Sequence, residues 1–231
     1  MKLLHLIFKR ETIAPVLTLT FASGVCVALV LARIIALGNI GYAFLVWNLF
    51  LAWLPLIFAQ LLRERYVNGE RRRWRLLGLG AAWLLFFPNA PYIFTDLVHL
   101  TTKFHGHFWA DMVVILLCAL TGLVLGFVSL FLVQSVVADR FGRAAGWLFI
   151  AVVAGLSGVG VFIGRFLRLN SWDVLLRPEK FYRHLNHWTA DPFGSAMPYV
   201  FPALFAVFLF IVYLMFYALT RLPPHIQNSK V

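Results

Sequence analysis

The sequence predicts an all-α integral membrane protein, a bundle of about six transmembrane helices. Hydrophobic residues make up 62% of the 231 residues and charged residues only 13%, about half the share found in an average soluble domain. Six apolar segments each approach the roughly 20 residues that a helix needs to cross the hydrocarbon core. Together they occupy more than half of the chain, so we expect one membrane domain over residues 1–231.

The predicted helices cover residues 13–35, 42–62, 76–98, 111–137, 145–167 and 196–220. The first run follows Lys9 and Arg10, as a signal peptide would, but it exceeds the roughly 7–15 apolar residues of such a peptide and no clear cleavage site follows it. It is therefore predicted to be an uncleaved helix. Interfacial aromatic residues lie near several helix ends: Tyr42, Trp74, Trp109, Trp147 and Tyr217.

Lys and Arg residues are distributed unevenly between the two sides of this bundle. The side that carries both termini has thirteen of them, six in the segment from Arg63 to Arg75, and the other side has seven. The positive-inside rule then predicts cytoplasmic N- and C-termini for a protein of the plasma (inner) membrane. The same distribution explains the net charge of +11, so membrane lipids are the expected partners and nucleic acid is not.

The third helix is interrupted by Pro88 and Pro91. Pro91 lacks the N–H that would reach the carbonyl of Phe87, and a freed carbonyl inside a membrane needs a partner or a water-lined cavity. Two interpretations stay open. The prolines produce either a kink that neighbouring side chains satisfy, or a broken helix that lines a binding cavity.

Ionisable residues gather at the outward end of the bundle. Asp96 and His99 share a helix face, as do Arg165 and Arg168, and Asp111 opens the fourth helix at the same membrane level. We predict that Arg165 or Arg168 pairs with Asp96 or Asp111, because an arginine near hydrocarbon needs a carboxylate or must reach the interface. This cluster is either an ion-pair lock between helices or a headgroup site. The candidate ligand-binding residues are Asn48, Asn89, Asp96, His99, Asp111, Arg165, Arg168, Asn170 and Asp173.

The connection over residues 168–195 is the longest. Arg177, Pro178 and Glu179 are typical of a helix start, and Phe181, Leu185 and Trp188 then recur at helical spacing. The pattern predicts a short amphipathic helix on the outer membrane surface.

A metal site would have to use His99, His105, His107 and Asp111, whose spacing matches no zinc motif. Cys26 and Cys118 lie inside apolar spans without a C-x-x-C pattern, so no cofactor is expected. No hydrolase, P-loop, zincin or dinucleotide motif is present in the sequence. The G-x-x-x-G steps at 122–126 and 160–164 predict close helix packing within the fold.

Three stretches together resemble a known family. They are WNLFLAWLP at 47–55, the segment 83–100 with FPNAPYIFTDLVHL, and GRFLR at 164–168 followed by NSWD at 170–173. This text resembles the bacterial membrane family called domain of unknown function 1361. Asp111 fits that pattern within a W-x-D start to the fourth helix, whereas His105 and His107 do not. The resemblance implies a multi-helix membrane protein and highlights the same polar residues, without implying an activity.

Three functions are compatible with these patterns. The first is a protein that binds or moves an anionic small molecule or a lipid headgroup through the arginines of the outward cluster. The second is a membrane-embedded enzyme acting on a lipid or polyprenyl substrate, with Asp96 and His99 as acid–base residues. The third is a structural or assembly protein whose polar cluster only fixes the fold.

Overall fold

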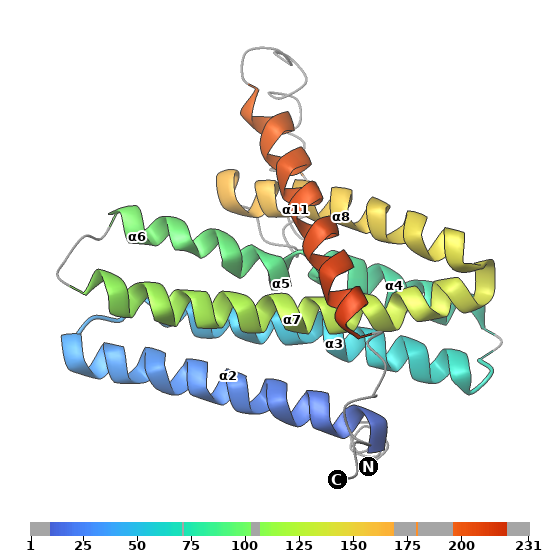
Figure 1. Ribbon diagram of the computed structural model, residues 1–231, viewed down its shortest axis with the longest axis horizontal. Helices are drawn as coiled ribbons and strands as arrows, with labels where there is room; N and C mark the ends of the chain where they lie inside the picture. The colour runs from blue at the N-terminus through green and yellow to red at the C-terminus, as the bar shows by residue number, and fades with distance from the viewer. Residues whose placement is uncertain (1–9, 71, 103–106, 169–178, 180–195, 221–231) are drawn as a thin grey trace, which may run out of the picture.

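The computed structural model describes residues 10–70, 72–102, 107–168, 179 and 196–220, with the side chains of 10–14 and 101–102 left out. Regular structure in this part of the chain is helical throughout, and six helical spans are long and apolar enough to cross a membrane. The predicted fold class is thus confirmed (Figure 1). In order, the elements are α2 (Arg10–Leu37), α3 (Ala43–Val67), α4 (Arg73–Phe86), α5 (Asn89–Tyr92), the 3-10 helix η1 (Ile93–Val98), α6 (His99–Thr102), α7 (Phe108–Phe141), α8 (Arg143–Phe166) and α11 (Met197–Leu219).

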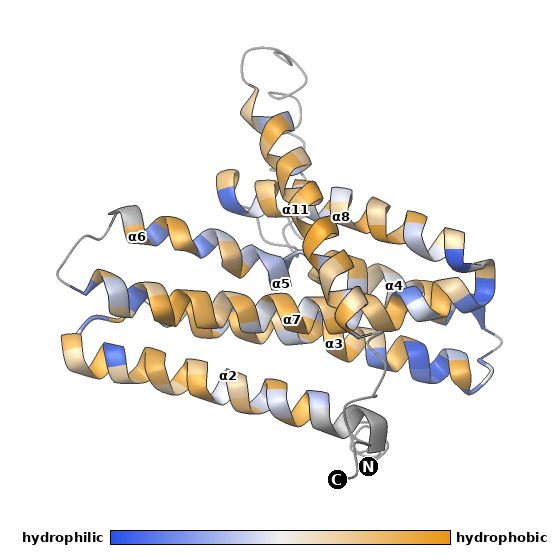
Figure 2. Ribbon diagram, viewed as in Figure 1, coloured by the Kyte–Doolittle hydropathy of each residue, from blue (hydrophilic) through white to orange (hydrophobic). Residues whose placement is uncertain are grey.

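The observed boundaries differ from the predicted ones mainly where a helix runs past its apolar stretch. α3 ends at Val67 rather than at residue 62, and α7 ends at Phe141 rather than at 137. The extensions contain Arg, Glu and Ala, which are good helix formers, so the backbone continues after the hydrophobic signal stops. Hydrophilic residues accordingly gather at the ends of the helices in Figure 2, while their long middle sections are hydrophobic.

α7 is the most buried span and α2 the least. α7 packs against α2, α3, η1 and α8, so it forms the centre of the bundle, while α11 packs mainly on α8 and crosses it steeply in Figure 1. A few polar bonds join the helices. Trp53 Nε1 of α3 donates to Ser23 Oγ of α2 (3.1 Å), and Trp83 Nε1 of α4 donates to Ser129 Oγ of α7 (3.2 Å).

Glycines allow the closest helix contacts. A Cβ added to Gly126 of α7 would lie 2.9 Å from the Cβ of Ala90, and one added to Gly122 would lie 3.0 Å from the Ala90 carbonyl oxygen. On α8, a Cβ at Gly160 would lie 2.8 Å from Cγ of Pro88. Both G-x-x-x-G steps therefore bring a glycine against the broken third span, inside the fold.

The break in the third span occupies Phe87 and Pro88, between α4 and α5. The Phe87 carbonyl, which cannot accept a bond from Pro91, instead accepts one of 3.1 Å from the Ala90 N–H, a tighter i+3 bond. The Asn89 side chain donates Nδ2–H to the Phe86 carbonyl at 2.9 Å. The kink thus satisfies these carbonyls locally, and the chain continues as the 3-10 turn that carries Asp96.

Some predictions fall outside the described residues. These are the amphipathic helix of the 168–195 connection and the candidate site residues His105, Asn170 and Asp173.

Candidate functional site

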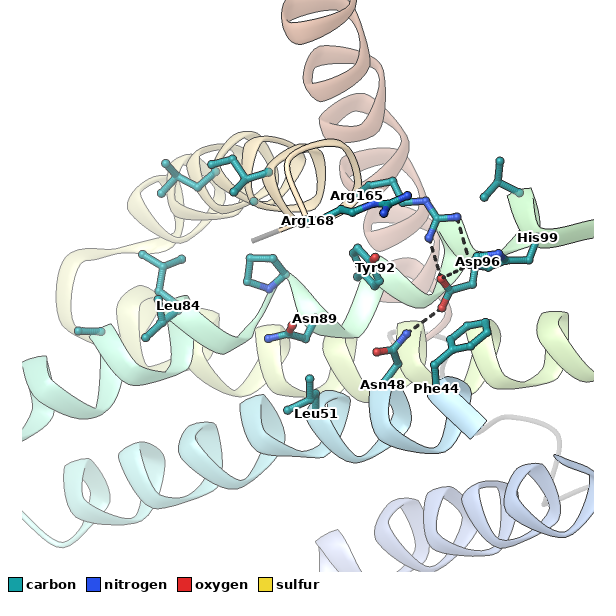
Figure 3. Close-up of a pocket in the computed structure, with 18 residues that line it drawn as sticks. Phe44, Asn48, Leu51, Leu84, Asn89, Tyr92, Asp96, His99, Arg165 and Arg168 are labelled. Atoms are coloured by element: carbon teal, nitrogen blue, oxygen red, sulfur yellow. Dashed lines mark hydrogen bonds and ion pairs between the residues drawn. The ribbon is translucent and has the colours of Figure 1, made fainter. Parts of the chain in front are cut away.

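A cavity of about 1030 Å³ lies between α3, the broken third span and α8 (Figure 3). One end of the cavity, called its mouth below, is lined by polar and charged side chains, which come from all three of these segments. They are Asn48 of α3, Asp96 and His99 of the third span, and Arg165 and Arg168 at the end of α8. The structure therefore brings five of the predicted site residues to one end of one cavity, and a sixth, Asn89, lines its middle.

Asp96 is the centre of the polar cluster. Only 1% of this residue is exposed. Arg165 donates from an Nη atom to Asp96 Oδ1 at 3.0 Å, and Asn48 donates Nδ2–H to Oδ2 at 2.9 Å. The predicted pairing of Arg165 with Asp96 is confirmed. Because the three residues come from α8, η1 and α3, the cluster ties three segments together at the mouth of the cavity.

His99 lies beside this ion pair. Its Nε2 is 3.8 Å from Asp96 Oδ1 and 3.5 Å from an Arg165 Nη atom. Its ring packs on Phe44, with centroids 4.9 Å apart. The distance to Asp96 exceeds a hydrogen bond, and both Asp96 oxygens already accept bonds from Asn48 and Arg165. The Asp96–His99 pair is therefore not arranged as a proton-transfer couple in this structure.

Arg168 follows the last turn of α8 and also lines the cavity. Its φ of 54° is in the left-handed region, the one such value among non-glycine residues in the described ranges. This conformation costs a side-chain-bearing residue about 1 kcal/mol or more relative to glycine. Arg168 is exposed, and within the described part of the chain it forms no ion pair.

Asp111 belongs to a different cluster. Arg33 of α2 binds both of its carboxylate oxygens, with one bond from Nε and one of 2.7 Å from an Nη atom. Tyr42 donates its hydroxyl at 3.1 Å, and the Arg33 guanidinium lies 3.8 Å above the Tyr42 ring. Asp111 was predicted to be one of the ligand-binding residues, but it does not line the cavity. It connects α7 to α2 instead.

Burial raises the pKa of the Tyr42 hydroxyl, and the neighbouring Asp111 carboxylate raises it further. Tyr42 therefore stays protonated at neutral pH and keeps its hydrogen bond to Asp111. Sequence analysis missed Arg33, which it counted only as an outer positive charge. Arg33 lies inside the predicted first helix, where the rule that an arginine near hydrocarbon needs a carboxylate would have found it.

The rest of the cavity, called its interior below, is apolar. It is lined by Leu51 of α3, by Ala81, Leu84 and Leu85 of α4, and by Leu156 and Ile163 of α8. Figure 3 shows Leu84 well away from the Asp96 cluster, with Asn89 and Tyr92 between them. One cavity thus combines a charged mouth with a hydrocarbon-like interior.

The candidate metal ligands do not come together. His99 lies in the Asp96 cluster, Asp111 is bound by Arg33, and His107 directly precedes α7. In the ranges that the structure describes, no group of three His, Cys, Asp or Glu residues could hold a metal ion.

A family model described as "Protein of unknown function (DUF1361)" matches residues 47–215. No curated protein and no solved structure matches the chain. The family match includes every residue that lines the cavity except Phe44. Because this match spans well over half of the sequence, the chain, with its six candidate membrane spans, belongs to the DUF1361 family.

Proposed function

We propose that this protein binds a lipid-like molecule with an anionic headgroup in the cavity between α3, the third span and α8. The observation that carries the proposal is the division of one cavity into a charged mouth and an apolar interior. A ligand that matches both parts has a negative group at one end and a hydrocarbon chain at the other.

The mouth of the cavity favours a negative charge. Arg165 and Arg168 both line it, while Asp96 is the one carboxylate among the described residues of the lining. Asp96 neutralises Arg165, and Arg168 is left to meet a ligand. An arginine fork forms bidentate, charge-assisted bonds with phosphate or carboxylate groups. Holding Arg168 in a costly backbone conformation at this position is typical of a functional site.

The interior favours an acyl or prenyl chain over a small ion. A volume of about 1030 Å³ lies at the upper end of the roughly 300–1,000 Å³ of ordinary ligand sites. Burying each methylene of a chain against such leucines contributes about 0.8 kcal/mol relative to water. The headgroup supplies selectivity, and the chain supplies the fit to the interior.

The charge distribution supports an orientation for this site. The arginine-rich α3–α4 connection lies at the opposite end of the helices from Arg165. Under the positive-inside rule both termini are cytoplasmic, and the cavity mouth faces the outer side of the plasma (inner) membrane. Binding is favoured over transport, because a second cavity at the cytoplasmic end shares no lining residue with the first.

The proposal is tested by titrating the detergent-purified protein with phosphatidylglycerol and, separately, with phosphatidylcholine of the same chains. A ligand that binds only the folded state, at 100 times its Kd, stabilises it by about 2.7 kcal/mol. We expect the anionic lipid to raise the thermal unfolding midpoint far more than phosphatidylcholine, and inorganic phosphate to have little effect. Equal shifts from both lipids would contradict a headgroup site.

Replacing Arg168 by glycine is expected to change stability and binding in opposite directions. Glycine adopts the left-handed conformation without strain, so the ligand-free protein gains about 1 kcal/mol. The same change removes the guanidinium and is expected to weaken phosphatidylglycerol binding about tenfold, since a charge-assisted bond contributes about 1.5–3 kcal/mol. Thermal unfolding with and without the lipid measures both effects. The variant Arg140→Gly, at the other end of the bundle, controls for the loss of one positive charge.

Filling the apolar interior is expected to exclude the chain while leaving the headgroup residues intact. Ala81 lines this part of the cavity and is exposed to it. We expect Ala81→Phe to lower the affinity for long-chain phosphatidylglycerol at least fivefold with little loss of stability, and to leave a short dihexanoyl analogue nearly unaffected. An equal loss for both lipids would show that the interior does not hold the chain.

A further inference from the structure

A second cavity, of about 370 Å³, lies at the opposite end of the bundle, where α7 turns into α8. Three membrane-spanning helices form its walls. The lining residues are Phe131, Gln134, Ser135, Ala138 and Asp139 of α7, Arg143 and Trp147 of α8, and Tyr217 of α11. This site is independent of the first cavity and of the function proposed for it.

The side-chain amide of Gln134 is buried, and among the described residues only its oxygen has a hydrogen-bond partner. It is 5% exposed, and its Oε1 accepts a hydrogen bond of 2.5 Å from the hydroxyl of Tyr213 on α11. The other half of the amide has no hydrogen-bond partner in the described part of the chain, although the residue lines the cavity. Buried polar groups in native proteins are nearly always paired, so the free Nε2–H of this amide can donate to a group that enters the cavity.

Positive charge is available beside Gln134. Arg143 is the first residue of α8, lines the cavity and forms no ion pair with any described residue. No side chain caps α8, and its first turn contains no acidic residue. The exposed N–H groups and the positive end of the helix dipole therefore add to the guanidinium, and together they favour a phosphate.

Negative charge is available on the other wall. Asp139, near the end of α7, lines the same cavity and accepts a hydrogen bond of 2.7 Å from the hydroxyl of Tyr66 on α3. A simple anion would be repelled by this carboxylate. A headgroup that carries a phosphate and an ammonium can satisfy Arg143 and Asp139 at the same time.

We infer that this second cavity binds the headgroup of a zwitterionic phospholipid of the phosphoethanolamine type. The phosphate is held by Arg143, Gln134 and the start of α8, and the ammonium by Asp139. Trp147 and Tyr217, whose rings pack edge to face at 5.0 Å, flank the headgroup as aromatic residues do at the membrane interface. Because the walls are membrane-spanning helices, the acyl chains remain in the adjoining leaflet.

Native mass spectrometry of the detergent-purified full chain tests this inference. The protein is incubated with equal amounts of phosphatidylethanolamine and phosphatidylglycerol, and the collision energy that releases each adduct is compared among variants. Arg143→Gln removes the phosphate contact. Arg140→Gln removes the same charge three residues earlier, near the end of α7, at a residue that does not line the cavity. Asp139→Asn removes only the ammonium partner.

We expect the abundance of phosphatidylethanolamine adducts to be at least fivefold lower in Arg143→Gln than in the wild type. In Arg140→Gln it is expected to equal that of the wild type. Asp139→Asn is expected to shift the preference toward phosphatidylglycerol. Equal adducts in Arg143→Gln and Arg140→Gln would overturn the site, and an unchanged lipid preference in Asp139→Asn would overturn the zwitterion assignment. Arg168→Gly acts on the first cavity alone, so failure of one site is distinguishable from failure of the other.

Discussion

Arg165→Ala is expected to destabilise the folded protein by about 3–5 kcal/mol, the range observed when one partner of a buried ion pair is removed. The substitution leaves Asp96, which is 1% exposed, with Asn48 as its remaining strong partner in the described structure. Unfolding in detergent, followed by circular dichroism, measures the loss.

The double variant Asp96→Ala with Arg165→Ala separates ion pairing from other effects of the substitutions. Because both charges are then absent, we expect it to be no less stable than either single variant. Arg168→Ala serves as the matched control, since it removes an exposed cation three residues later without breaking an ion pair among the described residues. Additive losses in the double variant would show that the two residues do not interact.

Gly158→Ala is the second change with a large expected effect. A Cβ at this position would lie 2.3 Å from the carbonyl oxygen of Pro202 on α11, and 3.1 Å from the carbonyl carbon of the same residue. Those atoms belong to the backbone, so α11 would have to move away from α8. Overpacking of this kind typically costs 1–3 kcal/mol, and we expect a loss at or above the upper end. Thermal unfolding in detergent measures it.

Gly155→Ala is the control for this prediction. Gly155 belongs to the same helix, and a Cβ there would meet nothing within 4 Å. Alanine is about 0.8–1 kcal/mol more favourable than glycine in a helix interior, so this variant is expected to be neutral or slightly stabilised. If both variants had the same stability, the close approach of α8 and α11 would be contradicted.

The six spans could be predicted because length and apolar composition dictate them in a membrane, where backbone groups must be satisfied within each helix. The pairing of Arg165 with Asp96 could also be predicted, because few partners exist for an arginine at that depth. The helix ends were predicted less accurately. α3 and α7 both extend past their hydrophobic stretches, because the residues that follow still favour a helix.

Two features depended on geometry that the sequence does not carry. Asp111 lies in the first turn of α7, at the predicted end of the bundle, but its carboxylate binds Arg33 of α2 and not Arg165. The cavity itself was not predictable, because Leu84 and Leu156 are as apolar as residues that face lipid. Only the separation of α4 from α8 makes them walls of one cavity. The spacing of apolar residues identifies the apolar face of a helix, but it does not show which helix packs against that face.

The most direct test of the proposed binding function is native mass spectrometry of the protein extracted gently from its own membrane, wild type beside Arg168→Gly. The variant is expected to be fully folded, so a lost adduct reports on the site and not on the fold. We predict a discrete anionic lipid or lipid-like adduct in the wild type that is absent or strongly reduced in the variant. If both proteins carried the same non-specific lipids, the cavity would not be a binding site, and the Asp96 cluster would serve only to hold α3, η1 and α8 together.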